Sequence, residues 1–292
     1  MDEQGLAKQL QAARQKAGLT QQQLCQQANL SFSTLTKIER GAIKAPSIFT
    51  IQAIAGALGV GLDELIGQAD SGRASRKLLK TKSGASFIYF DVNGCLLHFY
   101  QRAFTKLAAA TGVRSDIVEA AFWHYNDEVC RGILSLSDFN AKLTGRLGID
   151  SVNWQEYYME TVEPIAPMQE LLQWASQHYK VGLLTNTMPG FLSTLRRNKQ
   201  LPDIHYDAII DSSVIAAVKP EPKIYEIAAQ QAGYPPEEIL LIDDARPNLM
   251  AAERLGWHVV WFDDSQPEES AERAREALEP SEQPAGQQPQ VV

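Results

Sequence analysis

The sequence predicts an α/β protein in which a small all-α domain of five helices precedes a larger parallel-sheet domain with a helical cap. Apolar residues recur at helical spacing through residues 5–67, whereas residues 84–264 contain five short apolar runs of strand length. Helical stretches separate these runs, and this alternation favours βαβ units and a mostly parallel sheet. A length of 292 residues suits about two domains of ordinary size.

The first domain, residues 1–67, is predicted from helical periodicity and capping residues. Apolar residues repeat at helical spacing from Leu6 onward and define the first helix. Thr20 and Gln23 form a capping box for the second helix, and Ser31 can cap the third. The apolar residues that define the third, fourth and fifth helices are Leu35 and Ile38, then Ile48, Ile51, Ile54, Ala55 and Leu58, then Leu62, Leu65 and Ile66.

The second domain begins after a segment typical of a linker, residues 68–83, which is rich in Ser, Lys and Arg. The segment 97–165 reads almost wholly helical and is too long for one crossover, so we expect an inserted cap there. Residues 265–292 are rich in Glu, Pro, Gln and Ala, and we expect a disordered acidic tail, with a short helix at Glu268–Leu278 as the alternative. The expected strands are Ser86–Phe90, Val181–Leu184, Ala208–Ile210, Ile239–Ile242 and Val259–Phe262.

The formal net charge of −8 is unevenly distributed along the chain. Residues 1–82 hold 11 of the 27 Lys and Arg and 6 of the 35 Asp and Glu, which leaves 16 basic and 29 acidic residues for the remainder. A basic first domain followed by an acidic remainder indicates that only the first domain binds a polyanion. Uneven surface charge without a function is the alternative.

Composition also bears on the cellular compartment. No run of about 18 apolar residues occurs, and Met1–Gln4 is polar and acidic, so we expect neither a membrane span nor a secretory signal. Cys25, Cys95 and Cys130 are odd in number and show no CxxC spacing. We therefore expect a reduced, cytoplasmic protein.

The capping, turn and core residues of Gly18–Leu24 and Ser31–Gly41 form one continuous pattern. This pattern resembles the helix-turn-helix of the phage Cro/repressor (Xre) family, over about residues 5–67. The resemblance implies that the third helix enters the major groove of double-stranded DNA. It also implies a buried ion pair between Arg14 and Glu39. A five-helix module that binds protein is the alternative.

Five residues are predicted from this resemblance to contact DNA. Phe32, Ser33, Thr36 and Lys37 take the outward positions of the third helix, and Gln21 takes a place where the family clamps a phosphate. Ser33 and Thr36 can donate or accept at base edges, Lys37 suits guanine or a phosphate, and Phe32 could pack on a thymine methyl. Domains of this type bind as pairs on roughly two-fold sites, so we expect a homodimer.

Four polar stretches mark the second domain, and three of them directly follow strand-like runs. Active sites of open α/β sheets form at such strand ends. Asp91 can attack phosphorus as a carboxylate nucleophile, and Lys219 supplies a cation that offsets the charge of phosphoryl oxygens. Thr185 and Asn186 offer a hydroxyl and an amide to the same oxygens. The stretches are Phe90–Gly94, Leu183–Asn186, Val218–Pro222 and Leu241–Asn248.

In this order the stretches resemble the haloacid dehalogenase (HAD) superfamily, most of whose members are Mg²⁺-dependent phosphatases. The resemblance spans roughly residues 84–264 and implies a Rossmann-like sheet with a cap over the site. Asp243 and Asp244 offer hard oxygen ligands for Mg²⁺, which also needs Asp91 and can use the backbone carbonyl of Asn93. Dehalogenases lack this acid pair, so the pair argues for phosphate chemistry.

Asn93 departs from the phosphatase pattern. In these phosphatases the residue two places after the nucleophile is an aspartate that protonates the leaving group and then activates water. An amide cannot shuttle protons, and losing a general acid/base costs about 10²–10⁴-fold in rate. Good leaving groups would suffer less than alkyl phosphates. A slow or specialised phosphatase, a sensor of a phosphorylated ligand and other chemistry all stay open.

The cap is expected to choose the substrate. Arg131 could clasp an anionic substrate, although an Arg-Gly pair can also simply end a cap helix. The favoured hypothesis is a transcriptional regulator whose second domain binds, and in some cases hydrolyses, a small phosphorylated metabolite through an aspartyl-phosphate with Mg²⁺. The alternative is a HAD phosphatase whose helix-turn-helix serves dimerisation or localisation.

Overall fold

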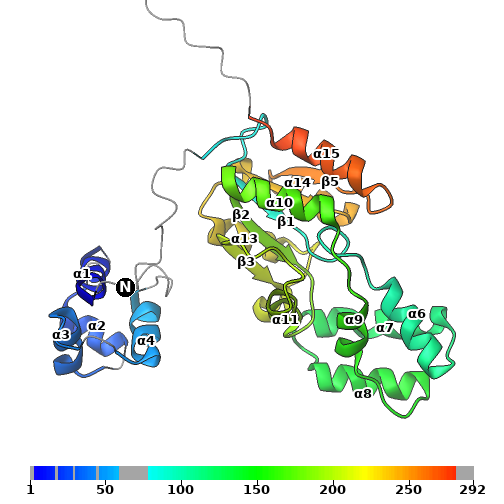
Figure 1. Ribbon diagram of the computed structural model, residues 1–292, viewed down its shortest axis with the longest axis horizontal. Coiled ribbons are helices and arrows are strands. Elements are labelled where there is room, and N and C mark those ends of the chain that lie inside the picture. The colour runs from blue at the N-terminus through cyan, green and yellow to red at the C-terminus, as the bar shows by residue number, and fades with distance from the viewer. Residues whose placement is uncertain (1–2, 17–18, 29, 44–45, 59–77, 281–292) are drawn as a thin grey trace, which may run out of the picture. The chain divides into compact units, whose positions relative to one another are not determined.

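The computed structural model of the chain describes residues 3–16, 19–28, 30–43, 46–58 and 78–280. Contacts divide the chain into two compact units, Met1–Arg76 and Lys77–Val292, whose helices and strands are labelled in Figure 1. The boundary between the units falls inside the predicted linker. Linker residues 68–77 lie outside the described residues. No helix among the described ranges is long and apolar enough to cross a membrane.

Helices alone form the described part of the first unit, as predicted. Their apolar faces meet in one core, in which Leu10, Leu24, Leu35 and Ile54 have no exposed surface. The predicted fifth helix, at residues 62–66, lies outside the described residues. The described helices are α1 (Glu3–Lys16), α2 (Gln21–Gln27), α3 (Phe32–Glu39) and α4 (Ile48–Leu58).

Hydrogen bonds at two helix starts match the predicted caps. Thr20 Oγ1 accepts from the N–H of Gln23 at 3.2 Å, and Gln23 Oε1 accepts from the N–H of Thr20 at 2.8 Å. Ser31 Oγ accepts from the N–H of Thr34 at 3.1 Å. Each such cap is worth about 1 kcal/mol, because it satisfies an N–H group that the helix itself cannot pair. The turn between α2 and α3 is therefore encoded locally.

The second unit is built on a parallel sheet, as predicted. The strand order is β3-β2-β1-β4-β5, so the first strand of the chain is central. The chain adds strands first on one side of β1 and then on the other, and open α/β sheets form their ligand crevice at such a reversal, outside the carboxyl ends of the strands. The strands are β1 (Phe87–Phe90), β2 (Lys180–Thr185), β3 (Ala208–Asp211), β4 (Ile239–Asp243) and β5 (His258–Trp261), and every pairing is parallel.

Helices cover both faces of this sheet. Phe87 and Tyr89 of β1 join the apolar core on one face, and Ile88 and Phe90 join the core on the other. Successive residues of a strand point to opposite faces, and because helices cover both faces, all four side chains are buried. The covering helices are α10 (Ala166–His178), α11 (Phe191–Arg197), α12 (Ser212–Ile215), α13 (Pro222–Ala232), α14 (Arg246–Arg254) and α15 (Pro267–Leu278), with a 3₁₀ turn, η1, at Pro236–Glu238.

A helical cap lies between β1 and α10, within the segment where it is predicted. Figure 1 shows its helices gathered beyond one end of the sheet. Buried aromatic rings hold them together: the ring centroid of Phe122 lies 4.6 Å from that of Trp154 and 5.1 Å from that of Phe104. The cap helices are α6 (Gln101–Thr111), α7 (Ser115–Cys130), α8 (Leu136–Leu147) and α9 (Trp154–Thr161).

The C-terminal segment corrects one expectation. Residues 267–278, placed in a disordered tail with a short helix at Glu268–Leu278 as the alternative, form α15, so the alternative holds. Ala271, Ala274 and Leu278 lie on one face of this helix and are buried in the core. The many charged residues occupy the other face, so composition alone hid the amphipathic pattern. Residues 281–292 lie outside the described part of the chain.

The end of the predicted linker is also corrected. Residues 78–83 belong to the second unit, where the side chain of Thr81 is almost fully buried. The N–H of Leu79 donates to the carbonyl of His178 at 2.9 Å, and Thr81 forms an isolated antiparallel β-bridge with Pro280. These contacts lie far apart in sequence, which a local reading of Ser and Lys content could not reveal.

Candidate active site

Strand register places the first carboxylates side by side. Phe90, the last residue of β1, pairs with Ile242 of β4, so the next residues of the two strands, Asp91 and Asp243, are neighbours. The N–H of Asp91 continues the ladder by donating to the carbonyl of Ile242 at 2.9 Å. Two buried parallel strands that end in register therefore bring two acids together at the carboxyl edge of the sheet.

A buried lysine joins these acids. Lys219 Nζ lies 2.8 Å from Asp91 Oδ1 and 2.5 Å from Asp243 Oδ2. The three side chains are nearly inaccessible to solvent. Buried charges persist only when they are paired, and removing one partner of such a pair is strongly destabilising. The cluster therefore holds the Lys219 ammonium beside the Asp91 carboxylate.

Asp243 is the anchor of the cluster. Its Oδ1 accepts from the N–H of Ala245 at 2.8 Å and from Asn248 Nδ2 at 3.0 Å. Its Oδ2 accepts from Lys219 and from the same Asn248 amide at 3.2 Å. Both carboxylate oxygens are thus engaged inside the protein. Asp91 and Asp244, in contrast, line the cavity above.

Gly94 allows Asp244 to approach the loop that follows β1. Gly94 has a φ of +92°, in a region that glycine tolerates and side-chain-bearing residues rarely adopt. A Cβ at this position would lie 2.5 Å from Asp244 Oδ2. The glycine is therefore required twice, once for the turn after β1 and once for the space that the carboxylate occupies.

The carboxylates fit a hard divalent cation. Asp91, Asp243 and Asp244 each offer an oxygen, and these atoms all lie within 4.8 Å of one another. Carboxylate oxygens are the protein ligands that Mg²⁺ prefers, with the remaining positions taken by water or phosphate. Because Asp243 is engaged by neighbouring donors, Asp91 and Asp244 are the better placed ligands. A role for the Asn93 carbonyl stays a prediction.

Crowding of buried acids perturbs their protonation. Burial raises the pKa of Asp91 to about 8, an effect that Lys219 opposes and that the charges of Asp243 and Asp244 reinforce. Burial, and then the charge of Asp243, raise the pKa of Asp244 to about 6. A cation between the carboxylates would favour their ionised forms, which are the forms that bind metal and attack phosphorus.

Asn186 lines the cavity and also supports the backbone of Lys219. Its Nδ2 donates to the carbonyl of Lys219 at 2.9 Å, and its Oδ1 accepts from the N–H of Lys219 at 2.8 Å. Thr185, at the end of β2, is fully buried and does not line the cavity, and its hydroxyl lies 3.5 Å from the carbonyl of Asn186. Contact of Thr185 and Asn186 with phosphoryl oxygens stays a prediction.

Asn93 is held from two sides. The hydroxyl of Tyr158 donates to Asn93 Oδ1 at 2.7 Å, and Asn93 Nδ2 donates to the carbonyl of Asn186 at 3.4 Å. Tyr158 is a buried residue of cap helix α9. Asn93 therefore links the cap to the sheet edge, and its amide orientation is set by these two partners.

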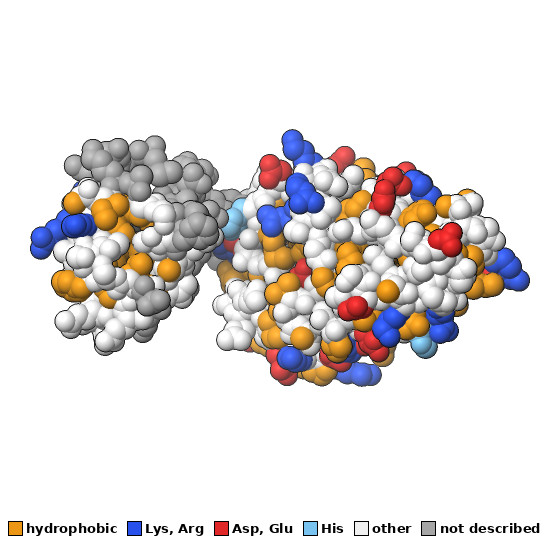
Figure 2. Space-filling view, turned by 90° about the horizontal axis from the view of Figure 1, so that it is seen from below, with side chains coloured by type: hydrophobic (Ala, Val, Ile, Leu, Met, Phe, Trp, Pro, Cys, Tyr) orange, Lys and Arg blue, Asp and Glu red, His pale blue; other side chains and the backbone are white. Residues whose placement is uncertain are grey.

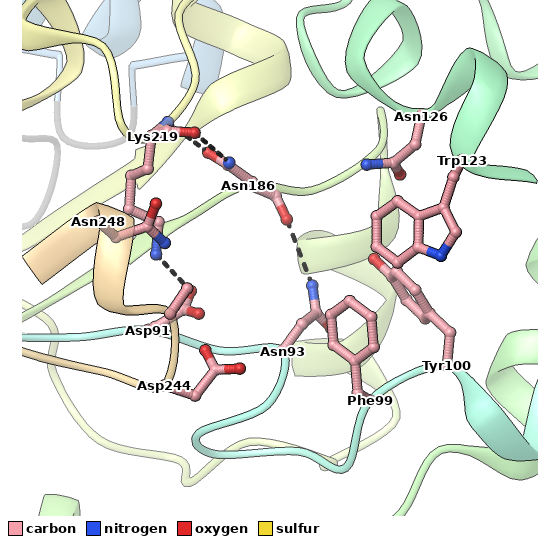
Figure 3. Close-up of a pocket in the computed structure, with 11 residues that line it drawn as sticks. Asp91, Asn93, Phe99, Tyr100, Trp123, Asn126, Asn186, Lys219, Asp244 and Asn248 are labelled. Carbon is pink, nitrogen blue, oxygen red and sulfur yellow. Dashed lines mark hydrogen bonds and ion pairs between the residues drawn. The ribbon is translucent and has the colours of Figure 1, made fainter. Parts of the chain in front are cut away.

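The cavity above the carboxylates has a volume of about 240 Å³ and is open to solvent on one side. Its floor is the sheet edge, with Asp91, Lys219 and Asp244. The cap supplies Trp123 and Asn126 from α7, and Phe99 and Tyr100 come from the segment that leads into α6 (Figure 3).

Arg131 does not line the cavity and stands at the C-terminal end of α7, as in the alternative in which the Arg-Gly pair ends a cap helix. Its guanidinium pairs with Asp127 Oδ2 at 2.7 Å and with Glu221 Oε1 at 2.7 Å. Glu221 follows the Lys219–Pro220 segment, so Arg131 ties the end of α7 to that loop. A guanidinium between two carboxylates has no net charge left to offer an anion.

The predicted ion pair of the first unit is confirmed. Arg14 Nε donates to Glu39 Oε1 at 2.7 Å, and Arg14 Nη2 donates to Glu39 Oε2 at 3.1 Å. The amide of Gln21 also donates to Glu39 Oε2, at 2.6 Å. The Gln21 side chain, predicted to hold a DNA phosphate, is therefore partly committed to this buried acid.

The outward face of α3 carries three of the predicted DNA contacts. Phe32 has 51% of its surface exposed, and Ser33 and Lys37 are exposed as well. Thr36 Oγ1, in contrast, is buried and makes no hydrogen bond with any described residue. The structure therefore presents Phe32, Ser33 and Lys37 together and turns the Thr36 hydroxyl inward.

Sequence reasoning missed the cap residues that face the site. Phe99, Tyr100 and Tyr158 were not predicted, although aromatic residues are dense in the cap segment. Trp123 and Asn126 are spaced i, i+3 and share one face of α7, which is a usable signal once the helix is known. No sequence spacing relates Tyr158 to Asn93, because their contact depends on how the cap folds back.

Comparisons with known proteins agree with two domains. A family model for the helix-turn-helix matches residues 10–65, and one for haloacid dehalogenase-like hydrolases matches residues 87–256. The immunity repressor protein of Bacillus phage phi105 is 44% identical over 59 residues, 20% of this chain and 40% of the repressor. The rhythmically expressed gene 2 protein of Drosophila melanogaster is 39% identical over 83 residues, 27% of this chain and 31% of that protein. Each match thus spans less than half of the relative.

Solved structures share the fold of the second unit. A HAD family enzyme from Bacteroides thetaiotaomicron, solved as a magnesium complex, has a TM-score of 0.53 at 20% identity and covers 61% of this chain and 93% of that one. The L-2-haloacid dehalogenase of Xanthobacter autotrophicus has a TM-score of 0.50 at 21% identity, covering 61% and 77%. The sheet order, the cap and the family match over more than half of the chain lead to one conclusion: the chain belongs to the haloacid dehalogenase-like hydrolase family, and it carries a helix-turn-helix domain before the hydrolase domain.

Proposed function

We propose that the chain is a DNA-binding transcriptional regulator whose HAD-like domain binds, and for suitable leaving groups hydrolyses, a small phosphorylated metabolite with Mg²⁺. The observation that carries the proposal is the convergence of Asp91, Lys219 and Asp244 at the floor of one cavity. A nucleophile, a cation and a metal-binding carboxylate are the parts that phosphoryl transfer from a monoester requires.

Each side chain of the floor has a role in this proposal. One oxygen of Asp91 attacks phosphorus, and the phosphorus–ester oxygen bond breaks as the new bond forms. Lys219, 2.8 Å from Asp91, offsets negative charge on the phosphoryl oxygens. Mg²⁺ held by Asp91 and Asp244 would neutralise further charge on the phosphoryl group. Water then attacks the phosphorus of the aspartyl-phosphate, which releases phosphate and restores the carboxylate.

Asn93 determines how fast this sequence can run. Its amide is fixed by Tyr158 and Asn186 and has no proton that it can give to a leaving oxygen. Binding of the phosphoryl group does not need that proton, whereas departure of an alkoxide does. The site therefore supports tight binding with slow turnover, which suits a domain that senses a metabolite for an attached DNA-binding domain.

The first unit supports the DNA-binding half of the proposal. Lys37, Ser33 and Phe32 are exposed together on α3, the helix that the helix-turn-helix architecture directs into the major groove. In Figure 2 the charged side chains visible on the first unit are basic, whereas basic and acidic ones are mixed over the second. A basic surface favours contact with a phosphate backbone. Because helix-turn-helix domains of this type bind DNA as pairs, we expect a homodimer on a two-fold site.

A second candidate function has one specific observation in its favour. Two predicted DNA contacts are partly withdrawn, because the Gln21 amide binds Glu39 and the Thr36 hydroxyl is buried. A HAD phosphatase whose helix-turn-helix serves dimerisation or localisation would tolerate that arrangement. Such a protein should release phosphate rapidly from metabolites with Mg²⁺ and should select no sequence from a randomised pool of DNA duplexes.

The test pairs two assays on the full chain. Selection from randomised duplexes should enrich one sequence, and hydrolysis of a panel of phosphate esters should be slow, Mg²⁺-dependent and absent in Asp91→Asn. Ester binding should change the affinity for the selected duplex at fixed salt concentration. An affinity that is identical with and without a saturating ester would reject the coupling between the domains.

A further inference from the structure

The cavity wall that faces the carboxylates is aromatic and uncharged. Phe99 and Trp123 stack with ring centroids 5.7 Å apart and planes 9° apart, and Trp123 keeps 42% of its surface exposed. Tyr100 and Asn126 complete the wall. Figure 3 shows these four side chains across the cavity from the sheet edge. The wall therefore offers flat apolar surface, and none of its side chains carries a charge.

The sequence of α7 directs this surface toward the cavity. Phe122 is fully buried in the cap core, whereas Trp123, the next residue, points away from that core. Asn126 follows one turn later on the same face. Asn126 Oδ1 accepts a weak hydrogen bond from Cys130 Sγ at 3.5 Å, and the Nδ2 atom points toward the cavity in Figure 3. The wall thus combines an aromatic face with two polar groups, the Asn126 amide and the Tyr100 hydroxyl.

Charge restricts what can lie against this wall. Lys219 is the one cationic side chain among the described residues that line the cavity, and Asp91 and Asp243 already pair with it. A ligand with a second anionic group would bring that charge against aromatic rings without a partner. Burying an unpaired charge is costly. The wall therefore offers no charge partner to the second anionic group of a bisphosphate or a phosphorylated carboxylic acid.

The acid/base position gives an independent reason for the same ligand class. Without a proton from Asn93, the ester oxygen must depart as an anion. A phenol has a pKa of about 10, far below that of an aliphatic alcohol, so an aryl oxygen departs much more readily without help. The chemistry at Asn93 and the shape of the wall thus favour the same kind of ester.

We propose that the site takes the monophosphate of an uncharged aromatic group, with the ring against Trp123 and Phe99 and an acceptor atom facing Asn126. This inference rests on the proposed phosphoryl-binding function and names its ligand class. In the first step a bond forms between an oxygen of Asp91 and phosphorus while the phosphorus–aryl oxygen bond breaks. The aryloxide leaves with the electron pair and takes a proton from water.

Binding of phosphonates tests this class without turnover, because a phosphorus–carbon bond is not hydrolysed. In calorimetric titrations of the full chain with Mg²⁺, phenylphosphonate should bind about tenfold more tightly than methylphosphonate, since ring stacking is worth about 1–1.5 kcal/mol. Phosphonoacetate, with its second anionic group, should bind no more tightly than methylphosphonate. Trp123→Leu should bring the ratio of the phenylphosphonate and methylphosphonate affinities close to one.

Two further variants make the result specific. Trp123→Phe keeps a flat ring and should retain most of the phenyl advantage. Ile117→Ala, an exposed position on the same helix outside the cavity, should change nothing. Equal affinity for the phenyl and methyl compounds, or tighter binding of phosphonoacetate than of phenylphosphonate, overturns the ligand class while phosphate binding stands. Failure of inorganic phosphate and every phosphonate to bind overturns the proposed function itself.

Discussion

Replacing Asn93 with aspartate should convert a slow site into a faster phosphatase. In Asn93→Asp the oxygen that accepts from the Tyr158 hydroxyl at 2.7 Å is retained, so the new carboxyl group keeps its orientation. The other oxygen would replace the nitrogen that now lies 3.4 Å from the carbonyl of Asn186. Two acceptors at that distance repel unless a proton lies between them. The position therefore favours a protonated carboxyl group, which is the form that a general acid needs.

The expected gain follows from the leaving group. A positioned general acid contributes about 10²–10⁴-fold, or about 2.7–5.4 kcal/mol of barrier. For an alkyl monophosphate such as glycerol 2-phosphate we expect kcat of Asn93→Asp to rise by about that factor. For p-nitrophenyl phosphate, whose leaving group needs no proton, the first step should gain little. The informative quantity is the ratio of the two kcat/KM values, measured with Mg²⁺ at low substrate concentration, because kcat/KM covers departure of the leaving group and not the later hydrolysis of the aspartyl-phosphate.

Two controls make this experiment decisive. Asn93→Ala removes the amide without adding an acid, and its kcat should not rise for either ester. Combining Asn93→Asp with Tyr158→Phe removes the donor at 2.7 Å that orients the new group, and part of the gain should disappear. A rise of less than tenfold on the alkyl ester, with phosphate affinity unchanged, would refute the view that Asn93 limits turnover.

Three other perturbations give separate tests. Gly94→Ala should abolish Mg²⁺-dependent phosphate binding, because its methyl group would lie 2.5 Å from a carboxylate oxygen of the site, whereas Gly112→Ala, also at positive φ but with open space around it, should leave binding intact. Burial alone would raise the pKa of Glu39, but hydrogen bonds from Arg14 and Gln21 outweigh burial and hold that pKa below its ordinary value. The Arg14–Glu39 pair therefore contributes its full stability to the first unit above about pH 4.3. That contribution is lost as pH falls through the lower pKa that Glu39 has in the folded state. In Arg14→Met this pH-dependent loss of protection from hydrogen exchange in α1 and α3 should be absent. Lys37→Ala should lower the slope of log affinity for duplex DNA against log salt concentration by about 1, and an unchanged slope would argue against a phosphate contact.

Local signals explain why most elements were predictable. Capping at Thr20 and Ser31 is encoded within four residues, and the strands are continuous apolar runs because helices cover both faces of the sheet. Register then follows from the fold. Once β1 and β4 are parallel neighbours, Asp91 and Asp243 must lie together. The acids of the floor were therefore readable from strand ends, whereas Lys219 lies in a loop that follows α12 and no strand directly precedes it.

Other features depend on contacts that no local pattern specifies. The helix at residues 267–278 was only the alternative to a disordered tail, because the small residues Ala271 and Ala274 become buried only by packing with α10 and β5. Arg131 was considered as an anion clamp because the sequence does not reveal Glu221, 90 positions away, as its partner. Tyr158 went unnoticed for the same reason. Long-range pairing, between the cap and the sheet edge or between α15 and the sheet, decides these roles rather than residue type.

The central claim is that Asp91, Lys219 and Asp244 together form one site for Mg²⁺ and a phosphoryl group. Calorimetric titration of the full chain with inorganic phosphate, with and without Mg²⁺, tests this claim most directly. Phosphate should bind the unaltered chain only when Mg²⁺ is present, and Lys219→Met, shown to be folded by circular dichroism, should bind at least tenfold more weakly. Equal phosphate affinity without Mg²⁺, or undiminished affinity in folded Lys219→Met, would contradict the claim.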